Sequence, residues 1–151
     1  MVTLQAALTP ELATAFTELK MKQVHSYLIF KIDSKVVTLE CAGKHKTEIA
    51  DKATRQKEEF ADFVAHMPKD QARYAIFDME IQYPDGHNSP KIVFFHYCPD
   101  ISKTTDKVLY SSSKGEVRKQ FGPLEKEFQI NNHADLILAK CIEAFLGGKV
   151  I

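Results

Sequence analysis

RYAIFDMEIQYPDGHNSPKIVFFHYC, residues 73–98, predicts the centre of the fold. Residues 73–83 alternate between apolar and polar side chains, which is typical of a strand with one solvated end. The Pro-Asp-Gly sequence at 84–86 then favours a tight turn. Residues 91–98 are almost continuously apolar, so we expect a central strand that is covered on both faces. This pair of strands predicts a sheet with a helical layer on each face.

Similar patterns assign the rest of the chain. Thr9 and Pro10 supply an N-cap hydroxyl and a first-turn proline, which predict a helix start. The polar residues 43–47 are interpreted as a loop. Further helices are expected over residues 10–20, 51–67, 106–121 and 134–146, and further strands over 27–33, 36–42 and 127–131. The order α-β-β-α-β-β-α-β-α predicts an α/β (α+β) fold, with one domain over residues 1–151 and a core from about 5 to 148.

Composition excludes several classes of protein. The chain has 151 residues, with 20 Lys and Arg against 20 Asp and Glu, so it lacks the basic field of a general nucleic-acid-binding protein. No apolar run is long enough to span a membrane, and the first residues lack the pattern of a signal peptide. Three widely spaced cysteines, Cys41, Cys98 and Cys141, fit a reduced intracellular protein better than a disulfide framework.

The stretch DKVLYSSSKGEVRKQF, residues 106–121, combines a helical pattern with three serines and a glycine, which disfavour helix interiors. The serines are expected to bond back to preceding carbonyls and to bend the helix. On a helical wheel, one face carries Leu109, Val117, Phe121 and Leu124, and a basic stripe of about 40° beside it carries Lys107, Lys114 and Arg118. Two interpretations stay open: a solvated helix face, or a helix that docks onto an acidic protein groove or onto phosphates.

These residues also carry a family resemblance. Cys98-Pro99-Asp100 followed by KVLYSSSKGEVRK, the strands RYAIFDMEIQY and KIVFFHY, and LATAFTELK at 12–20 together resemble the actin-depolymerising factor/cofilin family. The resemblance covers nearly the whole chain. It implies the ADF-homology fold, in which a central mixed five-stranded sheet carries helices on both faces and one long kinked helix is the main actin contact. It implies a protein that is not an enzyme and needs no cofactor or metal.

The resemblance also implies which residues bind. Thr105 and Gly115 depart from the family pattern, in which the first is often basic and the second is usually acidic. Asn88 and Ser89 likewise replace residues that are often basic, in a loop expected over 86–91. The surface for monomeric and filamentous actin would comprise Thr3, Leu4, Gln5, Lys107, Val108, Lys114, Arg118 and Lys119. The surface for filaments alone would comprise Lys91, Lys140 and Glu143.

The implied activity is actin binding that promotes filament depolymerisation, severing and turnover. Because several basic residues of the family pattern are replaced, we expect filament binding and severing to be weaker than is usual in the family. Thr3 is the candidate for phosphorylation that switches binding off. Phosphoinositides are a second expected ligand of the basic face. We expect a cytoplasmic monomer associated with the actin cytoskeleton. The alternative is a protein on the same fold that binds filament sides, as coactosin-like proteins do, or the Arp2/3 complex, as glia maturation factor does, without depolymerising.

A small hydrolase or metal enzyme is the remaining class, and it would need a convergent polar pocket. His96 and Cys98 share one face of a strand but are too few for a closed metal site, so we expect a packed core pair. Residues 43–47 lack the upstream glycine of a phosphate-binding loop. Asp78 and Glu80 share a strand face, and we expect a solvated sheet end there instead of an acid–base pair.

Overall fold

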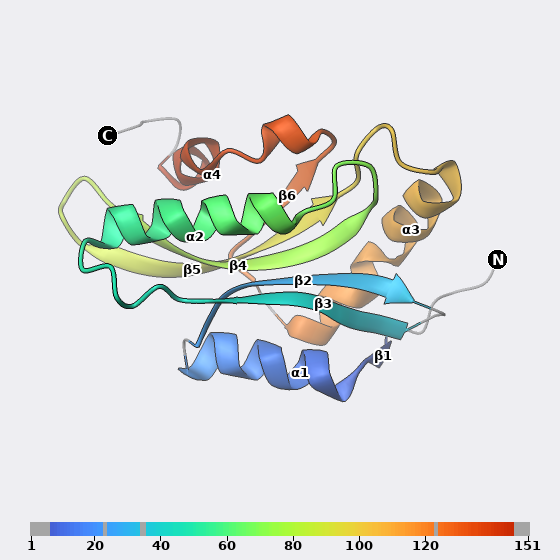
Figure 1. The fold of residues 1–151 in the computed structure, drawn as a ribbon, viewed down its shortest axis with the longest axis horizontal. Coiled ribbons are helices and arrows are strands. Elements are labelled where there is room, and N and C mark those ends of the chain that lie inside the picture. Colours follow the sequence, from blue (N-terminus) through green and yellow to red (C-terminus); the bar gives the residue numbers. More distant parts are fainter. Residues whose placement is uncertain (1–6, 23, 34–35, 123, 147–151) are drawn as a thin grey trace.

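A six-stranded mixed sheet runs through the centre of the molecule (Figure 1). The computed structural model describes residues 7–22, 24–33, 36–122 and 124–146. The strands are β1 (Ala7–Leu8), β2 (His25–Asp33), β3 (Val36–Lys44), β4 (Arg73–Gln82), β5 (Asn88–Tyr97) and β6 (Lys126–Ile130), in the order β1-β3-β2-β4-β5-β6. The pairs β1–β3 and β5–β6 are parallel and the others are antiparallel. The five predicted strands and their mixed sheet are therefore confirmed, and the two-residue β1 adds to one edge.

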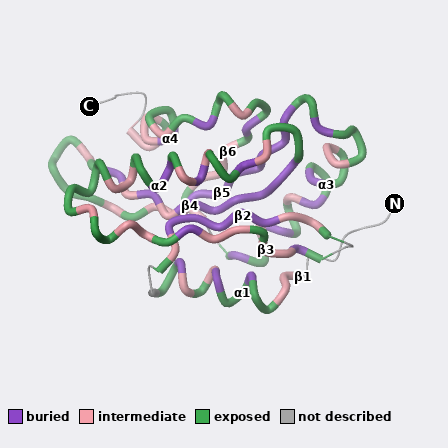
Figure 2. Tube along the Cα trace, viewed as in Figure 1, coloured by how far each residue is buried: buried purple, intermediate pink, exposed green. Residues whose placement is uncertain are grey.

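Helices cover both faces of this sheet, as predicted. They are α1 (Pro10–Thr17), α2 (Lys52–His66), α3 (Thr104–Phe121) and α4 (Leu138–Phe145), with a π-helical turn η1 (Glu18–Lys22) and a 3₁₀ turn η2 (His133–Asp135). Figure 2 shows the buried residues concentrated along the central strands. One core cluster joins α1 and α3 to Phe30, Tyr74 and Phe94. The other joins α2 and α4 to Phe77 and Phe95, so alternate residues of β4 and β5 serve opposite layers.

Local chemistry explains where the helices begin. The Thr9 hydroxyl accepts a hydrogen bond from the Leu12 amide at 3.4 Å, and Pro10 occupies the first turn, which confirms the predicted start of α1. Asp51 caps α2 in the same way, at 3.0 Å from the Thr54 amide. Regular α1 stops at Thr17, earlier than predicted, because the chain widens into η1, where Leu19 is fully buried.

Several other predicted boundaries are also wrong; for example, α3 begins at Thr104 and not at residue 106. The last helix begins at Leu138 and not at residue 134, because the Asn132 side chain accepts from the Ala134 amide at 3.2 Å and closes the separate turn η2 first. The supposed loop at 86–91 is mostly strand, since residues 88–90 pair with β4. Strand β3 continues to Lys44, two residues into the predicted loop.

Gly43 has a steric reason to be glycine. A Cβ atom at this position would lie 2.0 Å from the ring of Tyr27, which is itself 1% exposed. The ring packs directly on the backbone of β3, so any larger residue would displace it.

All described elements belong to this sheet and its two helical layers. The single domain over residues 1–151 stays a prediction, because its ends lie outside the described residues. Across the part of the chain that the structure describes, no helix is both long enough and apolar enough to cross a membrane.

Candidate functional site

Helix α3 is the longest helix of the fold and is held to the sheet along one side (Figure 1). Its buried side chains are Tyr110, Ser113, Val117 and Phe121. The Tyr110 hydroxyl accepts from the Ile32 amide at 3.0 Å, and the Tyr74 hydroxyl donates to the Tyr110 carbonyl at 2.5 Å. These bonds fix the rotation of α3 about its axis, and hence which residues face outward.

The predicted apolar face of α3 is partly correct. Val117 and Phe121 are buried, and Leu124 packs against the same core cluster. Leu109 was placed on this face, but it is 36% exposed because the buried stripe is centred on Tyr110 instead. The Ser112 hydroxyl donates to the Leu109 carbonyl at 3.2 Å, as expected for serine within a helix. A bend in the helix stays a prediction.

The outward side of α3 presents apolar side chains to solvent. Val108 is 62% exposed, and Ile101, in the segment before the helix, is 76% exposed. Ser112 and Lys119 lie along the same side and are also exposed. An exposed apolar residue and an exposed cation on one side of a helix are compatible with a surface that contacts another protein.

The predicted basic residues of α3 have different surroundings. Lys114 lies 2.7 Å from Glu127 Oε2 on β6, and Arg118 lies 3.0 Å from Glu127 Oε1. Lys119 is 74% exposed and pairs with the exposed Glu116 at 3.4 Å. The Lys107 ammonium donates to the carbonyl of Asp100.

Electrostatics around Glu127 reflect these two pairs. Burial alone would raise the pKa of the Glu127 carboxyl, but the hydrogen bond from Lys114 and the charges of Lys114 and Arg118 outweigh burial, so the pKa lies below its ordinary value. Glu127 is thus a carboxylate with a cation on each oxygen.

The predicted filament-only residues lie on two elements. Lys91 is in β5, 22% exposed, and lies 3.7 Å from Glu125. Lys140 is exposed and Glu143 half-buried on α4, which borders a cavity of about 510 Å³ shared with the β4–β5 hairpin and the start of α2. Thr3, Leu4 and Gln5, predicted for the actin-binding tail, lie outside the described residues.

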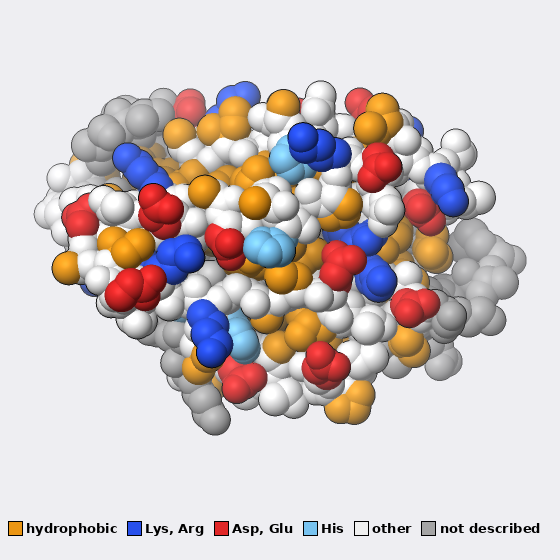
Figure 3. All heavy atoms as spheres, viewed as in Figure 1, with side chains coloured by type: hydrophobic (Ala, Val, Ile, Leu, Met, Phe, Trp, Pro, Cys, Tyr) orange, Lys and Arg blue, Asp and Glu red, His pale blue; other side chains and the backbone are white. Residues whose placement is uncertain are grey.

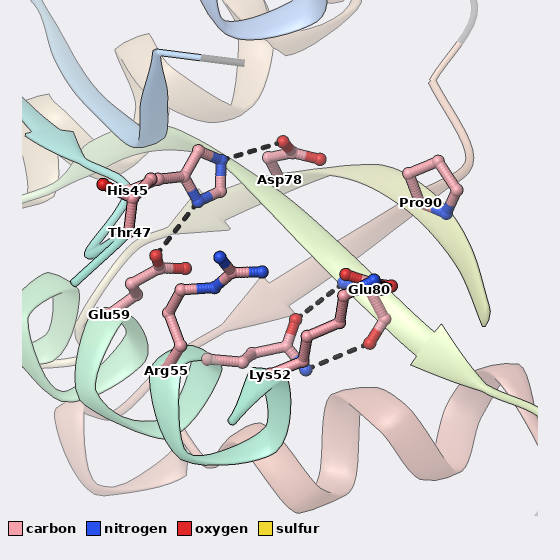
Figure 4. Close-up of a pocket in the computed structure, with 9 residues that line it drawn as sticks. His45, Thr47, Lys52, Arg55, Glu59, Asp78, Glu80 and Pro90 are labelled. Atoms are coloured by element: carbon pink, nitrogen blue, oxygen red, sulfur yellow. Dashed lines mark hydrogen bonds and ion pairs between the residues drawn. The ribbon is translucent and has the colours of Figure 1, made fainter. Parts of the chain in front are cut away.

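A polar cluster beside α2 was not predicted (Figure 4). His45 Nδ1 lies 3.0 Å from Glu59 and its Nε2 lies 3.1 Å from Asp78, and the Lys46 amide donates to Glu59 at 2.8 Å. These hydrogen bonds, first that to Asp78 and then that to Glu59, raise the pKa of His45 to about 9. One pattern in the sequence indicates a buried carboxylate here: Glu59 lies four residues before Phe63, on the same, buried face of α2.

The same cluster shows the surroundings of Asp78 and Glu80, the two carboxylates that share a face of β4. Asp78 is paired with His45, and Glu80 with Lys52 at 3.4 Å, so both are held by basic partners along the wall of a cavity of about 140 Å³. The expected solvated sheet end is therefore wrong for Asp78, whose side chain is only 11% exposed. Figure 3 shows acidic and basic side chains interspersed over the face in view, without a field of one sign.

His96 and Cys98 lie in the core, 3% and 8% exposed, as expected of a packed pair. Neither ring nitrogen of His96 has a hydrogen-bond partner. Burial, followed by the nearby charge of Lys114, lowers its pKa. Within the described residues, no group of three or more His, Cys, Asp or Glu side chains is arranged to hold a metal ion.

Comparison with known proteins assigns the family. The sequence model for cofilin/tropomyosin-type actin-binding proteins matches residues 5–144. An actin-depolymerizing factor from Vitis vinifera is 32% identical over 123 residues, which cover 82% of this chain and 80% of that protein. Among solved structures, Plasmodium berghei actin depolymerization factor 2 aligns with a TM-score of 0.80 at 22% identity, over 99% of this chain and all of that one (100%). Human coactosin-like protein aligns with a TM-score of 0.70 at 14% identity, over 100% and 96%.

The two structural likenesses concern the fold alone. They place the mixed sheet, its two helical layers and the long outer helix in the class of actin-depolymerising-factor homology domains. The sequence match goes further, because it covers most of the chain: this protein belongs to the cofilin/tropomyosin-type family of actin-binding proteins.

Proposed function

We propose that this protein binds monomeric and filamentous actin and promotes filament depolymerisation and turnover, without catalysing a reaction. The observation that carries the proposal is the outward side of α3, where Val108 is 62% exposed and Lys119, about three turns further along the same side, is also exposed. An exposed apolar residue and an exposed cation along one side of a helix fit a groove that is apolar at its centre and acidic at its rim. Membership of an actin-binding family supports actin as the partner.

Depolymerisation needs no catalysed reaction, only binding that discriminates between filament states. A protein that binds one filament conformation more tightly than another shifts the equilibrium toward the first by its difference in affinity. We propose that this chain favours a twisted, ADP-bound filament in this way. The relatives named actin-depolymerizing factor support this direction of action.

Filament severing is proposed to be weak. Lys91, on the predicted filament surface, is mostly covered and already paired with Glu125. The loop between β4 and β5 is short, because residues 88–90 belong to β5. Fewer free charges in this region slow the encounter with a filament side and reduce its specificity.

The same observation supports a second candidate function. A chain with a weak filament surface can bind filament sides or the Arp2/3 complex without releasing subunits. The likeness of the fold to human coactosin-like protein is compatible with this alternative.

Sedimentation of pre-formed actin filaments with increasing protein separates the two candidates. Depolymerisation predicts that the protein pellets with filaments while actin moves into the supernatant. Pelleting without release of actin would support side binding. Protein that leaves filaments intact and stays in the supernatant would contradict filament binding, and monomer and Arp2/3 binding would then be measured.

One further ligand and one modification are proposed together with this function. Phosphoinositide headgroups would be attracted by the cations of α3 and would compete with actin. Phosphorylation of Thr3 would add negative charge to the tail that faces acidic actin and would weaken binding. Vesicle competition and mass spectrometry of the cellular protein test these two proposals. We also propose that the protein acts in the cytoplasm, where actin filaments are found, and that it is a monomer.

A further inference from the structure

We infer that Glu127 holds Lys114 and Arg118 as positioning residues of α3, and that α3 meets its partner through the outer strip formed by Val108, Ser112 and Lys119. This inference rests on the proposed function and deepens it. It divides three basic residues of α3 into Lys114 and Arg118, which orient the helix, and Lys119, which lies on the strip and contacts the partner.

The geometry of the clamp is specific. Lys114 and Arg118 are four residues apart, so they lie one above the other on the same side of the helix. Each takes a different oxygen of Glu127, at 2.7 and 3.0 Å. No oxygen of that carboxylate is left without a cation. The pair therefore ties the second half of α3 to β6.

Burial makes these pairs costly to break. Glu127 is 20% exposed, and Lys114 and Arg118 are 33% and 34% exposed. A partner that drew Arg118 away would leave Glu127 with half of its compensation in a poorly solvated place. Arg118 gains less from a partner's carboxylate than a free arginine does, because it must first give up this one.

Lys119 has the opposite surroundings. It lies about 100° further around the helix than Arg118, on the solvent side. Its side chain is 74% exposed, and Glu116, its partner at 3.4 Å, is also exposed at 48%. Such surface pairs contribute little, so Lys119 can exchange Glu116 for an acidic group on a partner at little cost.

Two neighbouring charge removals test this division. Arg118→Gln and Lys119→Gln each remove one positive charge from adjacent positions, and circular dichroism confirms that both fold. In filament co-sedimentation at two salt concentrations, Lys119→Gln is expected to weaken binding by roughly threefold or more and to reduce its salt dependence. Arg118→Gln is expected to stay within about twofold of the wild-type protein.

A double-mutant cycle provides a second measurement that does not need actin. Arg118→Gln and Glu127→Gln are combined, and thermal midpoints are compared with those of a matched cycle of Lys119→Gln and Glu116→Gln. The first pair is expected to be coupled, so that removing Arg118 has a smaller effect once Glu127 is neutral. The second pair is expected to be additive.

The outcomes are distinct. If Arg118→Gln weakens actin binding as much as Lys119→Gln, and does so equally in the Glu127→Gln background, Arg118 contacts the partner and the inference is wrong. Additive midpoints for Arg118 and Glu127 would likewise overturn the clamp. If the wild-type protein does not bind actin at all, the proposed function is wrong, and so is the assignment of the outer strip as a binding surface. The double-mutant cycle would still decide whether Glu127 positions α3.

Discussion

His45 beside α2 and His96 beneath α3 are both largely removed from water, yet their surroundings are opposite. His45 has a carboxylate on each ring nitrogen, Glu59 at 3.0 Å and Asp78 at 3.1 Å. His96 is 3% exposed and has no partner on either nitrogen. Partners raise the pKa of the first to about 9, and burial lowers the pKa of the second. Burial thus determines the charge of a histidine only together with the groups that face it.

The two regions should consequently respond to pH in opposite directions. Folding keeps the imidazole of His45 charged on the α2 side and the imidazole of His96 neutral on the α3 side. Four experiments compare the α2 side with the α3 side, in order of decreasing expected effect on the free energy of unfolding.

The largest effect is expected from His45→Ala. The substitution leaves Glu59, which is 3% exposed, without its imidazolium, although the Lys46 amide still donates to it. Breaking a buried ion pair in this way costs about 3–5 kcal/mol. Urea unfolding at pH 7 measures the loss. His87→Gln is the control, because His87 pairs with Asp85 on the surface and should change stability little. Equal effects of the two variants would contradict the role of His45.

Raising the pH should weaken the same region. The pKa of His45 is raised from 6.5 to about 9 in the folded protein, so the folded state keeps a proton that the unfolded state has lost. The contribution is complete below about pH 6.5 and disappears as pH rises through 9, at a cost of about 3 kcal/mol. Urea unfolding between pH 6 and 10 should show this decline. His45→Gln should lack it, and an unchanged decline in that variant would assign it to another group.

A pair of glycine substitutions compares packing in the two regions. Gly43→Ala drives a methyl group into the Tyr27 ring, 2.0 Å away, and is expected to cost about 2–3 kcal/mol. Gly115→Ala, in α3, meets nothing within 4 Å and should stabilise the protein by about 0.5–1 kcal/mol through helix propensity. Thermal unfolding of both variants measures the difference. Loss of stability in Gly115→Ala would contradict the open space around this position of α3.

The smallest effect is expected from His96→Phe. Phenylalanine retains an aromatic ring next to Tyr74, whose ring centre lies 5.9 Å away, and removes two unpaired nitrogens. A gain of about 1 kcal/mol at pH 7.5 is expected.

The acid dependence of this variant is the sharper test. The groups that face His96 are Tyr74 on β4, Lys114 on α3 and Glu127 on β6. Because the pKa of His96 is lowered, the unfolded state binds the extra proton, and the wild-type protein should lose stability as pH falls below about 6.5. Unfolding at pH 5.5 and 7.5 should show this slope in the wild-type protein and a smaller slope in His96→Phe. An equal slope in both would exclude His96 as its source.

Sequence patterns predicted the fold well where structure depends on neighbouring residues. The hairpin of β4 and β5 was identified from alternation and from a continuous apolar run. The start of α1 was identified from its cap. The error at α4 arose because the Asn132 side chain closes a separate turn before the helix. The errors at β3 and β5 arose because pairing with a neighbouring strand extends both strands.

Partners of charged side chains were not predictable in the same way. The basic stripe of α3 was identified, but a helical wheel contains no information on the strand that lies beneath it. Glu127 follows Arg118 by only nine residues, yet it meets the helix because the chain turns back at Gly122 into β6. His45 likewise meets Glu59 and Asp78, which are 14 and 33 residues away.

The sequence by itself determined the order of helices and strands, the arrangement of one sheet between two helical layers, and the family. These depend on local propensity, on apolar periodicity and on motifs that are contiguous in the chain. Only the tertiary structure decided which cations of α3 pair with the sheet, which histidine is charged and which glycine cannot be replaced. Each of these depends on the distance and burial of groups from separate elements, and the energy of a charge or a close contact depends on those two quantities more than on the identity of the residue.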